Sequence, residues 1–322
     1  MSLQTLSGAP VVDRRVIPPE AMESRWTAPD GQAIRRIDWP AHGARGSLLF
    51  LPGRGDAYEK YLETLAHWHA RGWRVTAFDW RGQAGSGRLG RDPYTGHIGD
   101  FTSWTGDLSA LWAEWKSDAP GPHVVVAHSM GGHIVLRALA ERLIDPDAVV
   151  LSAPMLGIRR RGLPLGLLHG MARVLAGLGD RRRAAWKWSE KPGEVPADRI
   201  RLLTHDEARY ADELWWRAAR PDIVMGPASW GWVERALASI RAIERRGALE
   251  GVSVPVFLFG TTADALVEWA AIARAAARLP QGELKAFGEE ARHEILREVD
   301  PVRDAALAAI DTFLDRAAPE PA

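Results

Sequence analysis

One stretch of the sequence, an apolar strand that runs directly into a serine turn, constrains the fold more than any other. Residues 124–127 (Val-Val-Val-Ala) are continuously apolar, which is typical of a strand in a parallel sheet covered on both faces. His128-Ser129-Met130-Gly131-Gly132 follows at once, and residues 134–143 have helical spacing. A Gly-x-Ser-x-Gly turn between a strand and a helix exposes the serine hydroxyl at the carboxyl edge of the sheet, where it can act as a nucleophile. Ala127 stands in place of the first glycine, and an ordinary turn that holds a serine is the alternative.

Strands and helices alternate on both sides of this turn. Such alternation predicts right-handed β-α-β crossovers, and therefore an α/β fold with a mostly parallel central sheet flanked by helices. We expect strands at residues 34–39, 47–51, 73–78, 124–127, 148–151, 254–259 and 284–287, and helices at 58–70, 101–115, 134–143, 266–279 and 295–314.

The alternation fails in one internal stretch, where Gly, Pro, Arg and Trp dominate and the pattern is helical but irregular. We interpret this stretch as a helical cap inserted into the α/β core. The expected organisation is a first part of the core at 1–154, the cap at 155–228, a second part of the core at 229–316 and a frayed tail at 317–322.

The composition excludes several classes of site. The 322 residues include 41 basic and 41 acidic side chains, so the formal net charge of zero argues against a nucleic-acid-binding protein. No cysteine is present, which excludes disulfides, thiolate metal ligands and a cysteine nucleophile. Residues 1–20 contain no apolar signal region, and no run of about 18 apolar residues occurs anywhere. We therefore expect a cytoplasmic protein.

A serine nucleophile needs a base and an acid, and the sequence offers candidates for both at the ends of expected strands. In this strand-turn-helix setting the acid and then the histidine follow the serine along the chain. His293 lies in the loop between the last strand and the last helix, whereas His169 and His205 lie in the expected cap. Asp264 follows the preceding strand and would orient the imidazole of His293. Asp264 could instead only cap the next helix, and Glu268, one helical turn later, is the rival acid.

The loop after the second expected strand supplies candidate donors for an oxyanion. It reads Pro52-Gly53-Arg54-Gly55-Asp56. We expect the backbone N–H of Arg54, with that of Met130 after the nucleophile, to form an oxyanion hole. Gly53 permits close approach of the backbone to a substrate, and His128 beside the nucleophile is a further expected substrate contact. A glycine-rich turn without function is the alternative, and a P-loop is excluded because no Gly-Lys-Ser/Thr is present.

Four motifs of the chain resemble those of one family. Residues 51–61 are similar to its oxyanion loop and Tyr-bearing helix, with Pro52 in place of a histidine and Asp56 in place of a glutamate. The others are similar to its Asp-x-Arg-Gly loop, to the loop before the next helix and to its histidine loop, at residues 79–87, 97–101 and 292–298. Over residues 25–155 and 235–316 the chain therefore resembles the α/β-hydrolase superfamily, and in particular its monoacylglycerol lipase and lysophospholipase-like (serine aminopeptidase-like) branch.

The resemblance implies hydrolysis of a carboxylic ester through an acyl-enzyme, with no metal and no organic cofactor. Ser129, Asp264 and His293 match the family's triad positions. The implied substrate is a small molecule with an apolar acyl chain, such as a monoacylglycerol or a lysophospholipid.

The residues themselves leave other functions open. An amidase or aminopeptidase could use the same triad, but it would need a negative anchor for the substrate amine. Candidate anchors in the expected cap are Glu207, Asp212 and Glu213. A hydrolase-like binding protein without turnover is a further alternative, although such proteins usually lose triad members. The sequence does not indicate an oligomeric state.

The expected cap offers apolar surface with two possible roles. Residues 163–178 are largely apolar and are flanked by Arg159-Arg160-Arg161 and Arg181-Arg182-Arg183. One hypothesis is weak peripheral membrane contact, with the apolar face in lipid and the arginines on phosphates. The other is that the apolar face lines an acyl pocket and the arginines are solvated. Trp186 and Trp188 are expected to wall the substrate site.

Overall fold

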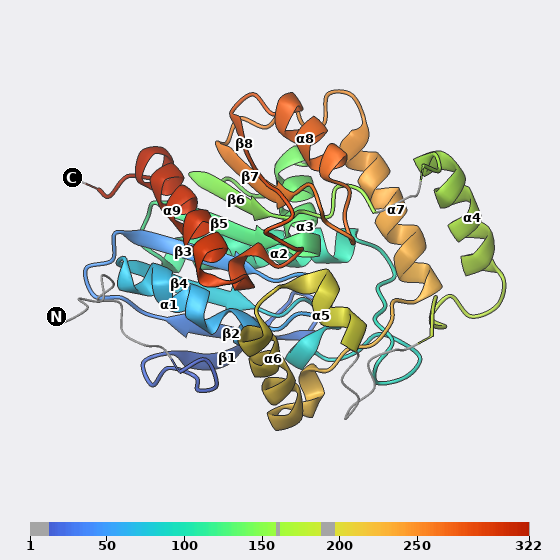
Figure 1. The fold of residues 1–322 in the computed structure, drawn as a ribbon, viewed down its shortest axis with the longest axis horizontal. Coiled ribbons are helices and arrows are strands. Elements are labelled where there is room, and N and C mark those ends of the chain that lie inside the picture. The colour runs from blue at the N-terminus through green and yellow to red at the C-terminus, as the bar shows by residue number, and fades with distance from the viewer. Residues whose placement is uncertain (1–12, 159–161, 188–196, 322) are drawn as a thin grey trace.

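A single β-sheet forms the centre of the computed structural model, which describes residues 13–158, 162–187 and 197–321 (Figure 1). The second strand pairs antiparallel with both of its neighbours, and all other pairs are parallel. Across the sheet the order is β1 (Met22–Thr27), β2 (Ala33–Trp39), β4 (Trp73–Phe78), β3 (Gly46–Leu51), β5 (His123–His128), β6 (Ala148–Ser152), β7 (Val256–Thr261) and β8 (Gly282–Phe287).

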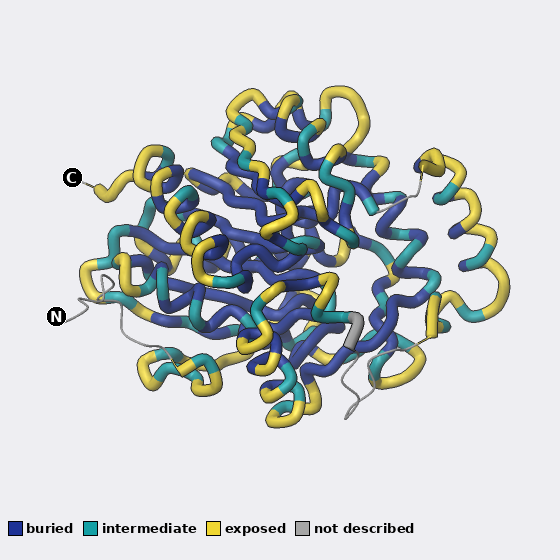
Figure 2. Tube along the Cα trace, in the orientation of Figure 1, coloured by how far each residue is buried: buried dark blue, intermediate teal, exposed yellow. Residues whose placement is uncertain are grey.

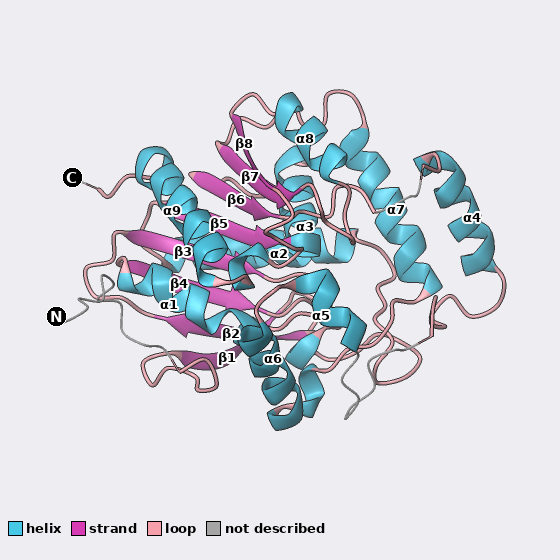
Figure 3. Cartoon of the chain, viewed as in Figure 1, coloured by secondary structure: helices cyan, strands magenta, loops and turns pink. Residues whose placement is uncertain are grey.

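Helices cover both faces of this sheet (Figures 1 and 3). In β3, Leu48 and Phe50 enter one hydrophobic core and Leu49 and Leu51 the other, because side chains alternate along a strand. The first core is closed by α1 (Leu62–Ala70) and α9 (Asp300–Ala317). The second is closed by α2 (Thr102–Asp118), α3 (Ser129–Ala140), α7 (Trp230–Glu244) and α8 (Trp269–Arg278). The α/β architecture predicted from the sequence is confirmed.

The observed elements differ from the predicted ones mainly at their ends. β1 was not predicted, because only Trp26 of its six residues is buried and the strand has no apolar pattern. β7 begins at Val256, directly after Pro255, which has no N–H to donate to a neighbouring strand. The last helix begins at Asp300, after a short 3-10 helix η4 (Ile295–Arg297) that contains the start of the predicted helix.

The helices of residues 155–228 lie in two separate places. In the described part of this stretch, α4 (Leu165–Gly177) lies beside α7 at the edge of the molecule (Figure 1). It packs Leu165 and Ala172 against Leu237 and Ile240 of α7. In contrast, α6 (Glu207–Ala219), which follows α5 (Ala197–Leu203), contacts the short 3-10 helix η1 (Tyr58–Tyr61) after β3. The outer side of α4 is exposed along its length (Figure 2).

No helix in the described ranges combines the length and the apolar character that crossing a bilayer requires.

Candidate active site

The turn from β5 into α3 holds Ser129 in a backbone conformation that few non-glycine residues adopt. Its φ is +49°, and its side chain is half-buried. Gly131 lets the helix approach β3, because a Cβ there would lie 2.5 Å from the carbonyl oxygen of Pro52. A Cβ at Gly132 would lie 2.9 Å from Cβ of Pro154. Ala127, which departs from the usual glycine, is fully buried in the core, so its methyl group fits here.

His293 and Asp264 form a hydrogen-bonded chain with Ser129. Nε2 of His293 lies 2.9 Å from Oγ of Ser129, and its Nδ1 lies 2.7 Å from Oδ2 of Asp264. The other carboxylate oxygen of Asp264 accepts hydrogen bonds from the backbone N–H groups of Leu266 and Val267. The three sequence candidates therefore meet, although they come from the ends of three different strands.

The environment sets the charge of the acid and the affinity of the base for a proton. Burial alone would lower the pKa of His293, but the carboxylates of Asp264, Glu294 and Asp56 together outweigh burial and raise that pKa above the ordinary value. Burial would likewise raise the pKa of Asp264, but the imidazole and the two backbone donors hold it below the ordinary value. This pairing fixes the imidazole tautomer that presents Nε2 to Ser129 as an acceptor.

The loop after β3 approaches Ser129 closely. A Cβ at Gly53 would lie 3.1 Å from Cβ of Ser129 and 2.8 Å from Oδ2 of Asp56. The N–H groups on either side of Arg54 are anchored: Gly53 donates to Asp56 at 3.1 Å, and Gly55 donates to Oε1 of Gln83 at 2.7 Å. These bonds fix the peptide that carries the Arg54 N–H.

The ring of His128 is buried beside the ring of His293. His128 is 2% exposed, and its ring lies 4.9 Å from the His293 ring. Burial, together with the charge of His293, lowers the pKa of His128 to about 4, so the ring is neutral at physiological pH. His128 therefore adds no positive charge beside the imidazole of His293.

Other residues that the sequence analysis named lie within residues 155–228. Trp186 is 49% exposed, and its ring centre lies 5.7 Å from the guanidinium carbon of Arg54. Trp188 and Arg159-Arg160-Arg161 lie outside the described residues. The histidines of residues 155–228 pair elsewhere, since His169 lies 3.1 Å from Glu234 and His205 lies 3.1 Å from Glu298.

A buried cluster of charges lies beside the site, and the sequence did not predict that its members pair with one another. The Lys60 ammonium lies 2.5 Å from Asp56, 2.7 Å from Glu294 and 3.1 Å from Glu213. Arg297 pairs with Glu213 at 3.0 Å and with Glu294. Burial would raise the pKa of each carboxyl group, but Lys60 is the largest opposing influence, and each pKa is lowered to about 2. The cluster joins the Gly53–Asp56 loop, α6 and the residues after His293.

This charge cluster bears on whether a metal could bind. Ligand atoms of Asp56, His128 and Glu294 lie within 4.8 Å of one another, which is the spacing of a metal site. However, the Lys60 ammonium already bridges the two carboxylates. A divalent cation would have to displace it, so these residues do not fit a metal.

Hydrogen bonds to backbone carbonyl oxygens also connect residues 203–209 to the residues that follow His293. Glu294 N donates to the carbonyl oxygen of Leu203 at 2.8 Å, and Thr204 Oγ1 donates to that of Arg297 at 2.8 Å. Arg209 donates to the carbonyl oxygen of Glu298 at 2.8 Å. The sequence alone shows that Glu294 and Arg297 are close enough along the chain to form an ion pair. It does not show their partners on α5 and α6, because the irregular pattern of residues 155–228 does not predict where those helices pack.

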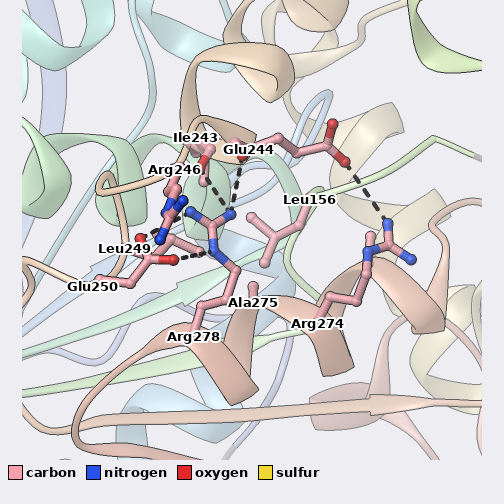
Figure 4. A pocket seen from close by; sticks show the side chains of 10 residues that line it. Leu156, Ile243, Glu244, Arg246, Leu249, Glu250, Arg274, Ala275 and Arg278 are labelled. Atoms are coloured by element: carbon pink, nitrogen blue, oxygen red, sulfur yellow. Dashed lines mark hydrogen bonds and ion pairs between the residues drawn. The ribbon is translucent and has the colours of Figure 1, made fainter.

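A separate cavity of about 440 Å³ lies between the end of α7 and α8, and its lining includes none of the residues of the Ser129 site (Figure 4). Its charged groups largely neutralise one another. Arg278 pairs with Glu250 at 2.8 Å and also donates to carbonyl oxygens at the end of α7, and Arg274 lies 3.7 Å from Glu244. The cavity contains no nucleophile and base in contact, so the Ser129 site is the candidate active site.

The order of the strands, the serine turn after β5, and the Asp and His on the loops after β7 and β8 define an α/β-hydrolase. Residues 42–300 match the family described as serine aminopeptidase, S33 (Hydrolase_4), and the chain belongs to this family.

Known proteins of similar sequence and structure agree with this assignment. The chain is 30% identical over 312 residues to lysophospholipase L2 of Escherichia coli strain K12, covering 91% of this chain and 87% of that protein. Its fold is similar to a soluble variant of monoglyceride lipase from Saccharomyces cerevisiae in complex with a substrate analog, with a TM-score of 0.72, 18% identity and coverage of 96% and 98%. A carboxyl esterase from Bacillus coagulans has a TM-score of 0.71, 19% identity and coverage of 92% and 98%.

Proposed function

We propose that this protein is a serine hydrolase that cleaves carboxylic esters through an acyl-enzyme. The hydrogen-bonded chain from Ser129 through His293 to Asp264 is the observation that carries the proposal. Ser129 is the nucleophile, His293 the general base and Asp264 the group that orients the imidazole. The backbone N–H groups of Arg54 and Met130 form the oxyanion hole. No metal or organic cofactor takes part.

The proposed reaction has two halves. Oγ of Ser129 attacks the ester carbonyl carbon while Nε2 of His293 takes the hydroxyl proton, and the oxyanion accepts hydrogen bonds from the two backbone N–H groups. The imidazolium then protonates the leaving alkoxide, which leaves the acyl group on Ser129. A water molecule, deprotonated by the same imidazole, attacks the acyl-serine and releases the acid.

The proposed substrates are lipid-like esters with an apolar acyl chain, namely monoacylglycerols or lysophospholipids. The names of the E. coli and yeast relatives support this class. An amidase or aminopeptidase is less well supported. Of the three carboxylates weighed as amine anchors, Glu213 is paired with Lys60 and Arg297, and Asp212 with Arg14 and Arg15 at 2.6 Å each. The third, Glu207, is exposed at the start of α6.

We also propose that residues 155–228 act as a cap and that α4 rests on lipid surfaces. Five apolar side chains with helical spacing are 43–63% exposed along and just beyond α4: Leu163, Leu167, Met171, Val174 and Leu178. Arg181 and Arg182 follow this stripe, and both are more than half exposed. An apolar stripe beside cations suits weak binding to an anionic bilayer. Such a protein would be cytoplasmic and peripheral to the membrane.

The test of the proposed function is kcat/KM for wild type and Ser129→Ala on a panel of substrates. The panel contains p-nitrophenyl esters of increasing chain length, a 1-monoacylglycerol, lysophosphatidylcholine and an aminoacyl anilide. We expect ester turnover that rises with chain length and is lost in Ser129→Ala. Cleavage of the anilide without the esters would instead establish an amidase, and a folded wild type inactive on every substrate would indicate a binding protein.

A further inference from the structure

We propose that the side chain of Arg54 forms a phosphate-binding subsite next to the reacting ester, which directs the enzyme toward phosphate-bearing monoacyl esters. The inference rests on the proposed function and names which of its substrates the site favours. It concerns the guanidinium of Arg54, whereas the oxyanion hole involves only the backbone N–H of that residue.

Arg54 is placed where a substrate head group would lie. Arg54 directly follows Gly53, where an added Cβ would lie 3.1 Å from Cβ of Ser129. The backbone of Arg54 therefore lies next to the nucleophile. Its side chain extends toward the chain between α6 and α7, where Nη2 donates to the carbonyl oxygen of Gly226 at 2.7 Å. Gly96 leaves room for it, because a Cβ there would lie 3.0 Å from Nη2. The guanidinium thus reaches from the reaction centre to residues 155–228.

The positive charge of Arg54 has no carboxylate partner among the described residues. Asp56 lies two residues away, but its oxygens accept from Lys60, Tyr61 and Gly53. Nε of Arg54 is shielded from solvent without a hydrogen-bond partner, and Nη1 donates to no described residue.

Three arginines that are less exposed than Arg54 have carboxylate partners. Each is paired with at least two carboxylates. The pairs are Arg35 with Glu59 and Asp79, Arg209 with Glu63, Asp206 and Asp300, and Arg297 with Glu213 and Glu294. Arg88 also lacks a carboxylate partner among the described residues, but its guanidinium donates to five carbonyl oxygens. Arg54 differs from all four, because the carbonyl oxygen of Gly226 is its one acceptor among the described residues.

The surroundings of Arg54 favour an incoming anion. Desolvation, followed by the charge of Arg199, lowers the pKa of Arg54 to about 10, so it stays charged at neutral pH but is poorly stabilised. The rings of Trp232 and Trp186 lie 5.3 Å and 5.7 Å from its guanidinium carbon, and they hold the side chain in place. A phosphate oxygen would supply the missing acceptor, since a guanidinium matches phosphate geometry with two parallel hydrogen bonds.

The chemistry of the candidate substrates makes this charge selective. A lysophospholipid carries its phosphate on the same glycerol unit as the acyl ester, whereas a monoacylglycerol has a neutral hydroxyl there. Because the oxyanion donor and the guanidinium belong to one residue, an acyl ester bound in the hole places its head group near Arg54. A neutral head group would leave the cation without an anion.

The test compares a lysophospholipid and a monoacylglycerol with the same short acyl chain, both below their critical micelle concentrations. The quantity measured is the ratio of their kcat/KM values. We expect wild type to favour the lysophospholipid, Arg54→Gln to lower that ratio by on the order of 10- to 100-fold, and Arg54→Lys to lower it less. The control is Arg246→Gln, an exposed arginine at the separate cavity of Figure 4, which should leave the ratio unchanged.

A second measurement separates this inference from the proposed function. Inorganic phosphate should raise the Tm of wild type, and that rise should be absent in Arg54→Gln, whether or not an ester is cleaved. An unchanged substrate ratio in a folded Arg54→Gln would overturn the inference and leave ester hydrolysis intact. Equal loss on both substrates would also overturn it, because it would assign Arg54 a purely structural role. A wild type that cleaves no ester would instead refute the proposed function.

Discussion

At the scale of single residues, the candidate site depends on how Asp264 holds His293. The carboxylate accepts one hydrogen bond from Nδ1 of the imidazole and two from the backbone, so both partners are fixed in position. Asp264→Asn keeps the shape but favours the wrong imidazole tautomer. We expect kcat for ester hydrolysis to fall by on the order of 10⁴, as in serine proteases, with little change in KM. A kcat within about tenfold of wild type, a change of only 1.4 kcal/mol in barrier, would contradict the role of Asp264.

The same pair predicts the pH dependence of the reaction. The base must be neutral to take a proton, and nearby carboxylates, Asp264 foremost, raise the pKa of His293 above its ordinary value. Activity should therefore fall as the pH drops through a pKa above about 6.5. Asp264→Asn should move this acidic limb to lower pH, because the imidazolium loses its carboxylate. Profiles of kcat/KM for both proteins check this, and a flat wild-type profile between about pH 5 and 8 would contradict it.

At the scale of elements, Lys60 connects three segments that are distant in sequence. Its ammonium pairs with Asp56 in the loop after β3, Glu213 on α6 and Glu294 beside His293. Lys60→Met would leave buried carboxylates with too little positive charge. We expect the free energy of unfolding to fall by about 3–5 kcal/mol.

Urea unfolding measures this change, and Lys116→Met is the matched control. Lys116 pairs with Asp145 on the surface, so its loss should cost less than about 1 kcal/mol. Equal stabilities of the two variants would show that the buried cluster does not connect these segments.

The same elements show how far the sequence could predict the site. Ser129 and Asp264 follow strands with continuous apolar patterns, and His293 lies between the last expected strand and the last expected helix. Because parallel strands bring their carboxyl ends to one edge of the sheet, the three residues could be found. Glu213 could not be found in this way. Its helix lies in the irregular stretch of residues 155–228, and its burial depends on Lys60 and Arg297, which other elements supply.

At the scale of the whole molecule, the helices that the structure describes within residues 155–228 form two groups with different surroundings. The part with α5 and α6 is hydrogen-bonded to the loop of His293, whereas α4 packs on α7 and exposes its outer side (Figure 2). The sequence predicts a helical cap over these residues, but an irregular helical pattern does not indicate which elements each helix packs against.

The exposed stripe of α4 gives a prediction at this scale. Replacing Leu167 and Val174, which are 52% and 62% exposed, by serine should weaken binding to vesicles containing phosphatidylglycerol by at least tenfold. Co-sedimentation measures this binding. Leu284→Ser on β8, where the leucine is 41% exposed, is the control and should bind as wild type does. If the α4 variant binds as tightly as wild type, α4 does not contact the bilayer.

A nucleophilic Ser129 carries the acyl group of the substrate during turnover. The most direct test of this covalent step is to quench the protein during steady-state hydrolysis of a p-nitrophenyl ester and to measure peptide masses. We predict one peptide, the one containing Ser129, heavier by the mass of the acyl group, and no such adduct in Ser129→Ala. Turnover with the adduct on another residue, or turnover that persists in Ser129→Ala, would show that Ser129 is not the nucleophile.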